Sequence, residues 1–167
     1  MNRRITLGTL IIACVLYVGS TQLCGQNSSM PKFTDLAPKD MVLLDRQRAV
    51  VSATVKQRYG AALTRTKKDL PILQKLIDES VFAKSQTYEL QSLGVAFGDV
   101  MASALPLHWV MITDEYGTDP TLRYKNTTLN VNVLTIISQR IERNERVSLS
   151  ELLRMTSQQL AAYDKNR

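Results

Sequence analysis

The chain is poor in the residue types on which most catalytic and metal sites depend. Its 167 residues include two cysteines and a single histidine, His108. A nucleophilic dyad that needs histidine therefore has one possible base, and zinc sites built from several histidine and cysteine ligands are excluded by count. We expect His108 to be a structural or exposed residue, and we expect no cofactor.

Both cysteines, Cys14 and Cys24, lie in or beside an N-terminal apolar segment. Asn2-Arg3-Arg4 precedes an apolar run from Ile5 to Val18, an arrangement typical of a secretory signal. The run is short, because a helix that spans the hydrocarbon core of a membrane needs about 20 apolar residues. We therefore predict an export signal over residues 1–25, after which the mature chain has no cysteine and forms no internal disulfide.

The sequence leaves three routes open for processing of this signal. Small residues at Val18-Gly19-Ser20 or at Leu23-Cys24-Gly25 suit ordinary cleavage and release. Ile11-Ile12-Ala13-Cys14 has the form of a bacterial lipoprotein box, and an uncleaved segment is the third route. We expect a periplasmic or secreted protein, or alternatively one that is anchored by a lipid or by its N-terminus and faces the periplasm. Contact with a membrane is expected only through this N-terminal segment.

Long runs of one charge are also missing. The net charge of +6 falls by two when residues 1–25 are removed, because Arg3 and Arg4 leave and no acid does. The basic residues of the mature chain are scattered, with Lys67-Lys68 as the longest basic run, and aromatic residues make up only 6% of the sequence. Nucleic-acid binding normally uses clustered cations and aromatic platforms, so we expect no nucleic-acid partner.

The mature chain has the organisation of a linker followed by one domain. Residues 26–40 combine turn formers and two prolines without periodicity and predict a linker, and the domain is expected over residues 41–167. Helical spacing of apolar residues, with Asp69 as an N-cap, predicts helices over residues 41–59, 69–81 and 87–105.

The third predicted helix carries Gly94 and Gly98 on or beside its apolar face. Glycine costs about 0.5–1 kcal/mol relative to alanine inside a helix, so these residues indicate that something gains from close backbone approach. The two interpretations are tight packing of the helix on a sheet and a groove for a ligand.

The second half of the domain changes to strand patterns and then returns to helix. β-branched and alternating residues predict strands over residues 107–113, 121–124 and 128–133. Helical spacing resumes over residues 136–143, and Ser148 with Glu151 forms a capping box for a last helix. The predicted fold class is α+β in a single domain: three helices, a small antiparallel sheet of about three strands, then two helices.

Polar residues are densest around the turn between the first two predicted strands. A binding surface with tyrosine and arginine anchors would use Asp114, Glu115, Tyr116, Asp119, Arg123 and Tyr124. A solvated turn and a calcium site are the alternatives for the same residues, although the spacing lacks the EF-hand pattern. We predict no metal ion here and take the six residues as the candidate binding site.

An enzymatic alternative is a hydrolase that acts on cell-wall material through a pair of carboxylates. The candidates are Asp99, Asp114 and Glu115, and such a pair requires a cleft and a suitable separation. Asp99 lies beside the apolar face of the third predicted helix, so a partly buried carboxylate that pairs with an arginine is its more ordinary role. We therefore name no catalytic residue.

Several ordered segments resemble a bacterial family of domains of unknown function, number 3806 among such families. The resemblance covers roughly residues 44–155 and implies a bacterial source and one compact domain, but no established activity. It rests on Leu44-Asp45-Arg46-Gln47-Arg48, residues 86–99, Trp109-Val110, Asp114-Glu115-Tyr116-Gly117, Asp119-Pro120, Leu122-Arg123-Tyr124, Ile137-Ser138 and Arg140-Ile141-Glu142.

Together these features predict an exported protein of the cell envelope that binds another macromolecule without catalysis. The expected partner is a protein in the envelope, and a specific version is an immunity-type protein that neutralises a toxin. The hairpin from Asp114 to Tyr124 is the expected contact surface, and the carboxylate-dependent hydrolase is the alternative.

Overall fold

The structure is a computed structural model that describes residues 31–166. The predicted export signal, residues 1–25, lies outside the described residues. In chain order the elements are β1 (Lys32–Thr34), α1 (Pro38–Tyr59), the 3-10 helix η1 (Lys67–Asp69), α2 (Leu70–Asp78), α3 (Thr87–Ala104), β2 (Leu107–Asp114), β3 (Gly117–Tyr124), β4 (Asn130–Val131), α4 (Val133–Ile136), α5 (Ser138–Glu142) and α6 (Leu149–Lys165).

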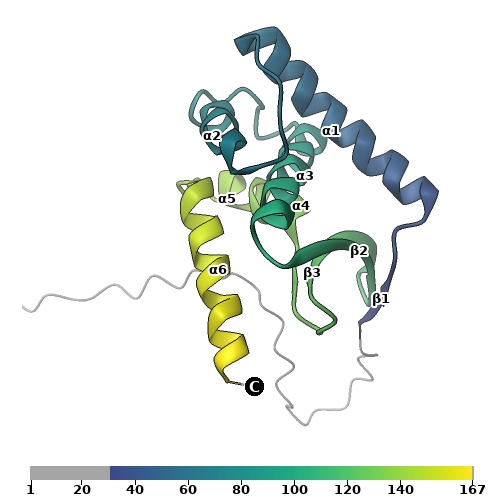
Figure 1. The fold of residues 1–167 in the computed structure, drawn as a ribbon. Helices are drawn as coiled ribbons and strands as arrows, with labels where there is room; N and C mark the ends of the chain where they lie inside the picture. Colours follow the sequence, from purple (N-terminus) through teal and green to yellow (C-terminus); the bar gives the residue numbers. More distant parts are fainter. Residues whose placement is uncertain (1–30, 167) are drawn as a thin grey trace, which may run out of the picture.

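The strands form one antiparallel sheet in the order β1-β2-β3-β4. Its centre is the β2–β3 hairpin, which pairs Leu107 with Tyr124 at its open end and Asp114 with Gly117 at its tip. The α+β class and the single domain are confirmed, and the sheet has four strands where about three were predicted. Helices surround one side of this sheet, and α6 lies at the opposite side of the molecule from β1 (Figure 1).

The additional strand lies inside the stretch that was predicted as a linker. Phe33 pairs with Ile112, so β1 adds an edge to the sheet, and α1 begins at Pro38. A strand of three residues is too short to show alternation in a sequence, and its partner is about 80 residues away. Pro38 suits the first turn of a helix because its missing N–H would have no helical partner there. The part of the linker before residue 31 lies outside the described residues.

Helix α3 is the central element of the core. It contacts α1, η1, α2, β2, α4 and α5 (Figure 1). The apolar stripe predicted for it is buried, and Phe97, Val100 and Met101 are each fully inaccessible to solvent. Burial of side chains this large contributes about 1.5–3 kcal/mol each, so α3 supplies much of the hydrophobic stabilisation of the fold.

Both glycines of α3 are points of close packing. A Cβ on Gly94 would lie 2.3 Å from the carbonyl oxygen of Val133, and one on Gly98 would lie 2.6 Å from the Trp109 ring. The missing side chain of Gly94 lets α4 pack closely against α3, and that of Gly98 lets β2 do so. The glycines therefore serve tight packing and do not line a ligand groove.

The segment after β3 departs from its prediction in two ways. The strand predicted over residues 128–133 is paired only at Asn130 and Val131, because Val133 already begins α4. The helix predicted over residues 136–143 is found as α5, and a separate short helix, α4, precedes it on the other side of Ile137. Ile137, between the two, is fully buried and keeps helical backbone angles of φ −89° and ψ −51°. The predicted N-cap of α6 is confirmed, since Ser148 Oγ accepts a hydrogen bond from the Glu151 amide.

Candidate functional site

The tip of the β2–β3 hairpin, residues 113–119, holds four of the six predicted binding residues. Asp114, Glu115, Tyr116 and Asp119 are all exposed there, and the Tyr116 side chain is 86% exposed. Asp114 Oδ1 accepts a hydrogen bond of 2.8 Å from the Tyr116 amide, which closes the turn. The hydroxyls of Thr113 and Thr118 bond to each other across the two strands at 2.9 Å. The tip is thus a turn that is fixed by its own hydrogen bonds and that exposes one aromatic ring and three carboxylates.

The other two predicted residues, Arg123 and Tyr124, lie at the open end of the hairpin. Arg123 Nε donates to the Thr127 carbonyl at 2.7 Å, and its guanidinium lies 4.6 Å from the centroid of the Phe33 ring. Tyr124 is 2% exposed, and its hydroxyl donates to Asp164 at 2.5 Å. Both side chains hold the fold together, so they do not join the four tip residues in one site.

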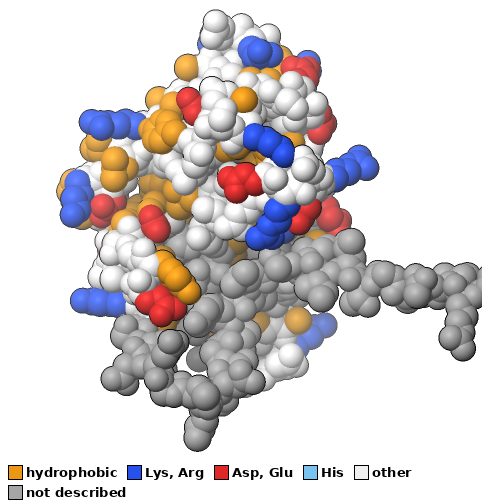
Figure 2. All heavy atoms as spheres, turned by 180° about the vertical axis from the view of Figure 1, so that it is seen from behind, with side chains coloured by type: hydrophobic (Ala, Val, Ile, Leu, Met, Phe, Trp, Pro, Cys, Tyr) orange, Lys and Arg blue, Asp and Glu red, His pale blue; other side chains and the backbone are white. Residues whose placement is uncertain are grey.

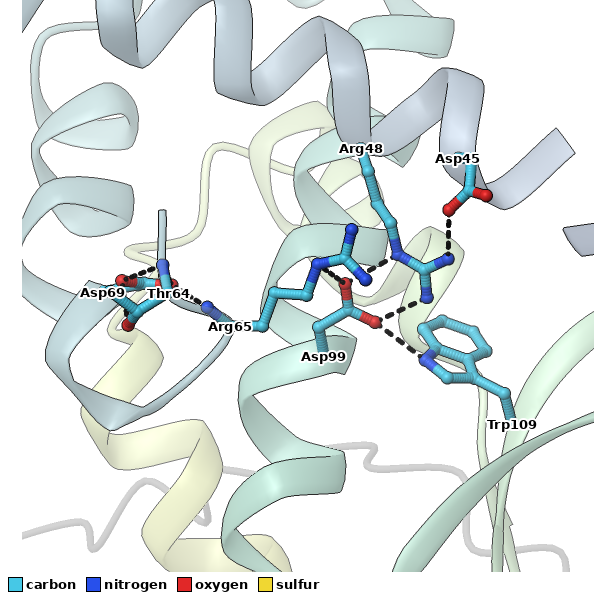
Figure 3. Close-up of polar contacts among 7 residues, drawn as sticks. All are labelled: Asp45, Arg48, Thr64, Arg65, Asp69, Asp99 and Trp109. Atoms are coloured by element: carbon cyan, nitrogen blue, oxygen red, sulfur yellow. Dashed lines mark hydrogen bonds and ion pairs between the residues drawn. The ribbon is translucent and has the colours of Figure 1, made fainter. Parts of the chain in front are cut away.

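A second polar cluster joins α1, α3 and β2 at Asp99, which is only 8% exposed (Figure 3). Arg48 approaches it with two parallel hydrogen bonds, from Nε to Oδ2 and from Nη2 to Oδ1, both 2.7 Å long. Trp109 Nε1 donates to Oδ1 at 2.9 Å. The bond to Asp99 raises the pKa of Arg48 above its ordinary value, with a smaller contribution from Asp45. This bidentate geometry is the strongest form of a side-chain ion pair.

Arg65 approaches the same carboxylate from the loop between α1 and η1. Its Nε lies 3.9 Å from Asp99 Oδ2, and its side chain is 62% exposed. The loop is held by Asp69, whose carboxylate accepts hydrogen bonds from the amides of Thr64 and Arg65 and from the Thr64 hydroxyl (Figure 3). Asp69 was predicted as the N-cap of a helix. Asp69 does occupy the N-cap position of α2, but its side chain makes no capping hydrogen bond there and faces back to the loop, while the Thr66 side chain caps η1.

The Asp99 cluster favours a structural role over acid–base chemistry. A general acid or base needs an oxygen that can reach a substrate, whereas the oxygens of Asp99 already accept from Arg48 and Trp109. Trp109 is also five positions before Asp114 on β2, which is roughly 17 Å at the rise of a strand. Asp99 and the acids of the hairpin tip therefore do not form the carboxylate pair of a hydrolase.

The described residues offer little for a metal ion or a polyanion. Within residues 31–166 no group of three or more His, Cys, Asp and Glu side chains is arranged to hold a metal ion. On the face in Figure 2, lysine and arginine side chains are interspersed with acidic ones and do not gather into a basic patch. His108, at the start of β2, is exposed. None of the helices that the structure describes is long and apolar enough to cross a membrane.

Sequence reasoning foresaw that Asp99 pairs with an arginine, but it did not identify which one. Leu44, Val51 and Val55 are fully buried on the inner face of α1, and Arg48 occupies the turn between the first two. A cation within an apolar stripe was the available signal, because it can stay charged there only with a buried partner. No comparable signal marks Arg65, which reaches Asp99 through a loop.

Comparisons with known proteins place the chain in a family. No curated protein matches it. A crystal structure from Bacteroides thetaiotaomicron VPI-5482, at 1.50 Å resolution, is similar with a TM-score of 0.70 and 15% sequence identity. The similarity covers 77% of this chain and 48% of that one, so this chain spans about half of its length, and identity this low shows the fold alone. The model of the family described as a domain of unknown function (DUF3806) matches residues 69–152, half of the chain, and this chain therefore belongs to that family.

Proposed function

We propose that this chain is an exported protein of the cell envelope that binds another protein and that its contact surface is the hairpin tip. The N-terminal sequence supports export, and the tip supports binding. The single observation that carries the binding proposal is the combination of an 86% exposed tyrosine with a turn that is held by its own hydrogen bonds.

Physical chemistry explains why such a tip suits recognition. Tyrosine gives a large amphipathic contact at low entropic cost, and it is enriched among the residues that dominate binding energy. Because the turn is closed before a partner arrives, little ordering entropy is lost on association. Asp114, Glu115 and Asp119 lie within three positions of Tyr116 and give the tip negative charge, so the partner surface that fits is basic, with a hollow for one aromatic side chain.

The test uses the exported protein as bait for envelope proteins of the source cell. We expect Tyr116→Ala combined with Asp119→Asn to weaken capture of the specific partner by roughly 30-fold or more, as loss of a dominant aromatic contact does. Tyr88→Ala is the matched control, because Tyr88 is also an exposed tyrosine (48%) but lies on α3. Melting temperatures of both variants should stay close to that of the wild type.

A partner that fits the proposal is captured less at high salt, because the tip carries three carboxylates. Equal capture by the tip variant and the wild type would reject the tip as the contact surface. Release of fragments from purified cell wall by the protein would instead favour hydrolysis.

A further inference from the structure

A small apolar pocket opens between α2, α3 and α5, away from the hairpin tip. Its volume is about 140 Å³. Its floor is formed by side chains that are almost fully buried, and Lys84 lies at its rim. The residues that define it here are Leu76, Phe82, Leu90, Leu93 and Ile141, together with Lys84.

The lining of this pocket is mostly apolar, with Ser80 and Lys84 as its polar residues. A space of about 150 Å³ accepts a molecule of the size of benzene. Water would find few polar partners on this floor, so the pocket suits one aromatic ring or a short aliphatic chain.

The rim adds a charge to this apolar hollow. Lys84 Nζ donates to the Glu142 carbonyl at 3.4 Å and to the side chain of Asn144, which ties the loop after α2 to the end of α5. Both acceptors are neutral, and among residues 31–166 no carboxylate forms an ion pair with Lys84. A cation with only neutral acceptors at the mouth of an apolar pocket is complementary to an anion that has an apolar body.

We propose that this pocket binds a small apolar carboxylate, with its ring or chain on the leucine floor and its carboxylate at Lys84. The site is separate from the hairpin tip and does not depend on the proposed binding of a protein there. Recognition would combine burial of the apolar body with a charge-assisted hydrogen bond at the rim.

The experiment compares benzoate with benzyl alcohol, which has the same ring and nearly the same size but no charge. Both are titrated into the full chain while the melting temperature is followed, since a ligand that binds only the folded state raises it. We expect both to bind and benzoate to bind about two- to fivefold more tightly, the advantage typical of an exposed ion pair. Lys84→Met should remove this advantage and leave the affinity for benzyl alcohol unchanged. Lys67→Met, the control, should change the affinity for neither compound.

A second variant tests the location of the site. Leu93→Phe fills the floor and should abolish binding of both compounds. In case that variant does not fold, nuclear Overhauser effects between the benzoate ring and the methyl groups of Leu90 and Leu93 locate the ligand in the wild type. Absence of binding by both compounds, or binding without these effects, would overturn the proposal. Equal affinity for the two compounds would overturn the assignment of an anionic ligand.

Discussion

Replacement of Arg48 by methionine tests whether the buried ion pair is a main support of the fold. Methionine keeps the apolar stem of the side chain in the stripe of α1 but removes the guanidinium. Asp99 then loses two charge-assisted hydrogen bonds of 2.7 Å while it stays 92% buried. Removal of one partner of a buried pair costs about 3–5 kcal/mol, because an unpaired charge is left behind.

Two contacts of Asp99 reduce this cost to the lower end of the range. Trp109 Nε1 still donates to Oδ1 at 2.9 Å, and Arg65, 3.9 Å away on an exposed side chain, can move closer. We therefore expect Arg48→Met to lower the free energy of unfolding by about 3 kcal/mol. For a protein of this length that corresponds to a drop in melting temperature of about 9 °C. The free energy of unfolding of Arg48→Lys should lie between those of the wild type and Arg48→Met, because lysine restores the charge but not the bidentate fork.

The assay is urea unfolding followed by the fluorescence of Trp109, the only tryptophan of the chain, with circular dichroism as a second probe. Asp45→Ala is the control, because Asp45 also bonds to Arg48 but is 64% exposed, and such surface pairs contribute at most about 1 kcal/mol. A loss below 1 kcal/mol for Arg48→Met, or one equal to that of the control, would refute the reasoning.

Elements with a local pattern could be predicted from the sequence. The stripe of α3 has helical spacing, the run of β2 is β-branched and aromatic, and Ser148 caps α6 through a bond to a residue three positions away. These signals involve neighbours along the chain, so folding of distant segments does not change them. For the same reason β1 was missed, because its three residues become a strand only when β2 is beside them.

The candidate site illustrates the limit of sequence proximity. Six polar residues within eleven positions look like one cluster, but a strand extends about 3.3 Å per residue. Tyr124 is therefore roughly 23 Å along β3 from the turn at Gly117, and it pairs at the other end of the hairpin. Asp69 shows a related ambiguity, because an aspartate at a helix start can cap that helix or accept from the loop before it. Local sequence does not decide between these roles.

Two further predictions concern single contacts. Arg154 lowers the pKa of the Glu151 carboxyl through a hydrogen bond, so the stability from this pair is present above the ordinary glutamate pKa and is lost as the pH falls through the lowered value. NMR titration of Glu151 should show its pKa rise in Arg154→Ala, and an unchanged value would contradict the pairing. Gly94→Ala should destabilise the fold more than Gly98→Ala, although the new Cβ would meet an atom at less than 3 Å in both. At Gly94 the obstacle is the Val133 carbonyl, which is backbone and can move only with α4, whereas at Gly98 it is a side chain. Overpacking of this kind costs about 1–3 kcal/mol, a range that chemical denaturation can resolve. An equal loss of unfolding free energy in the two variants would contradict this reasoning, because it would show that α4 moves as easily as a side chain.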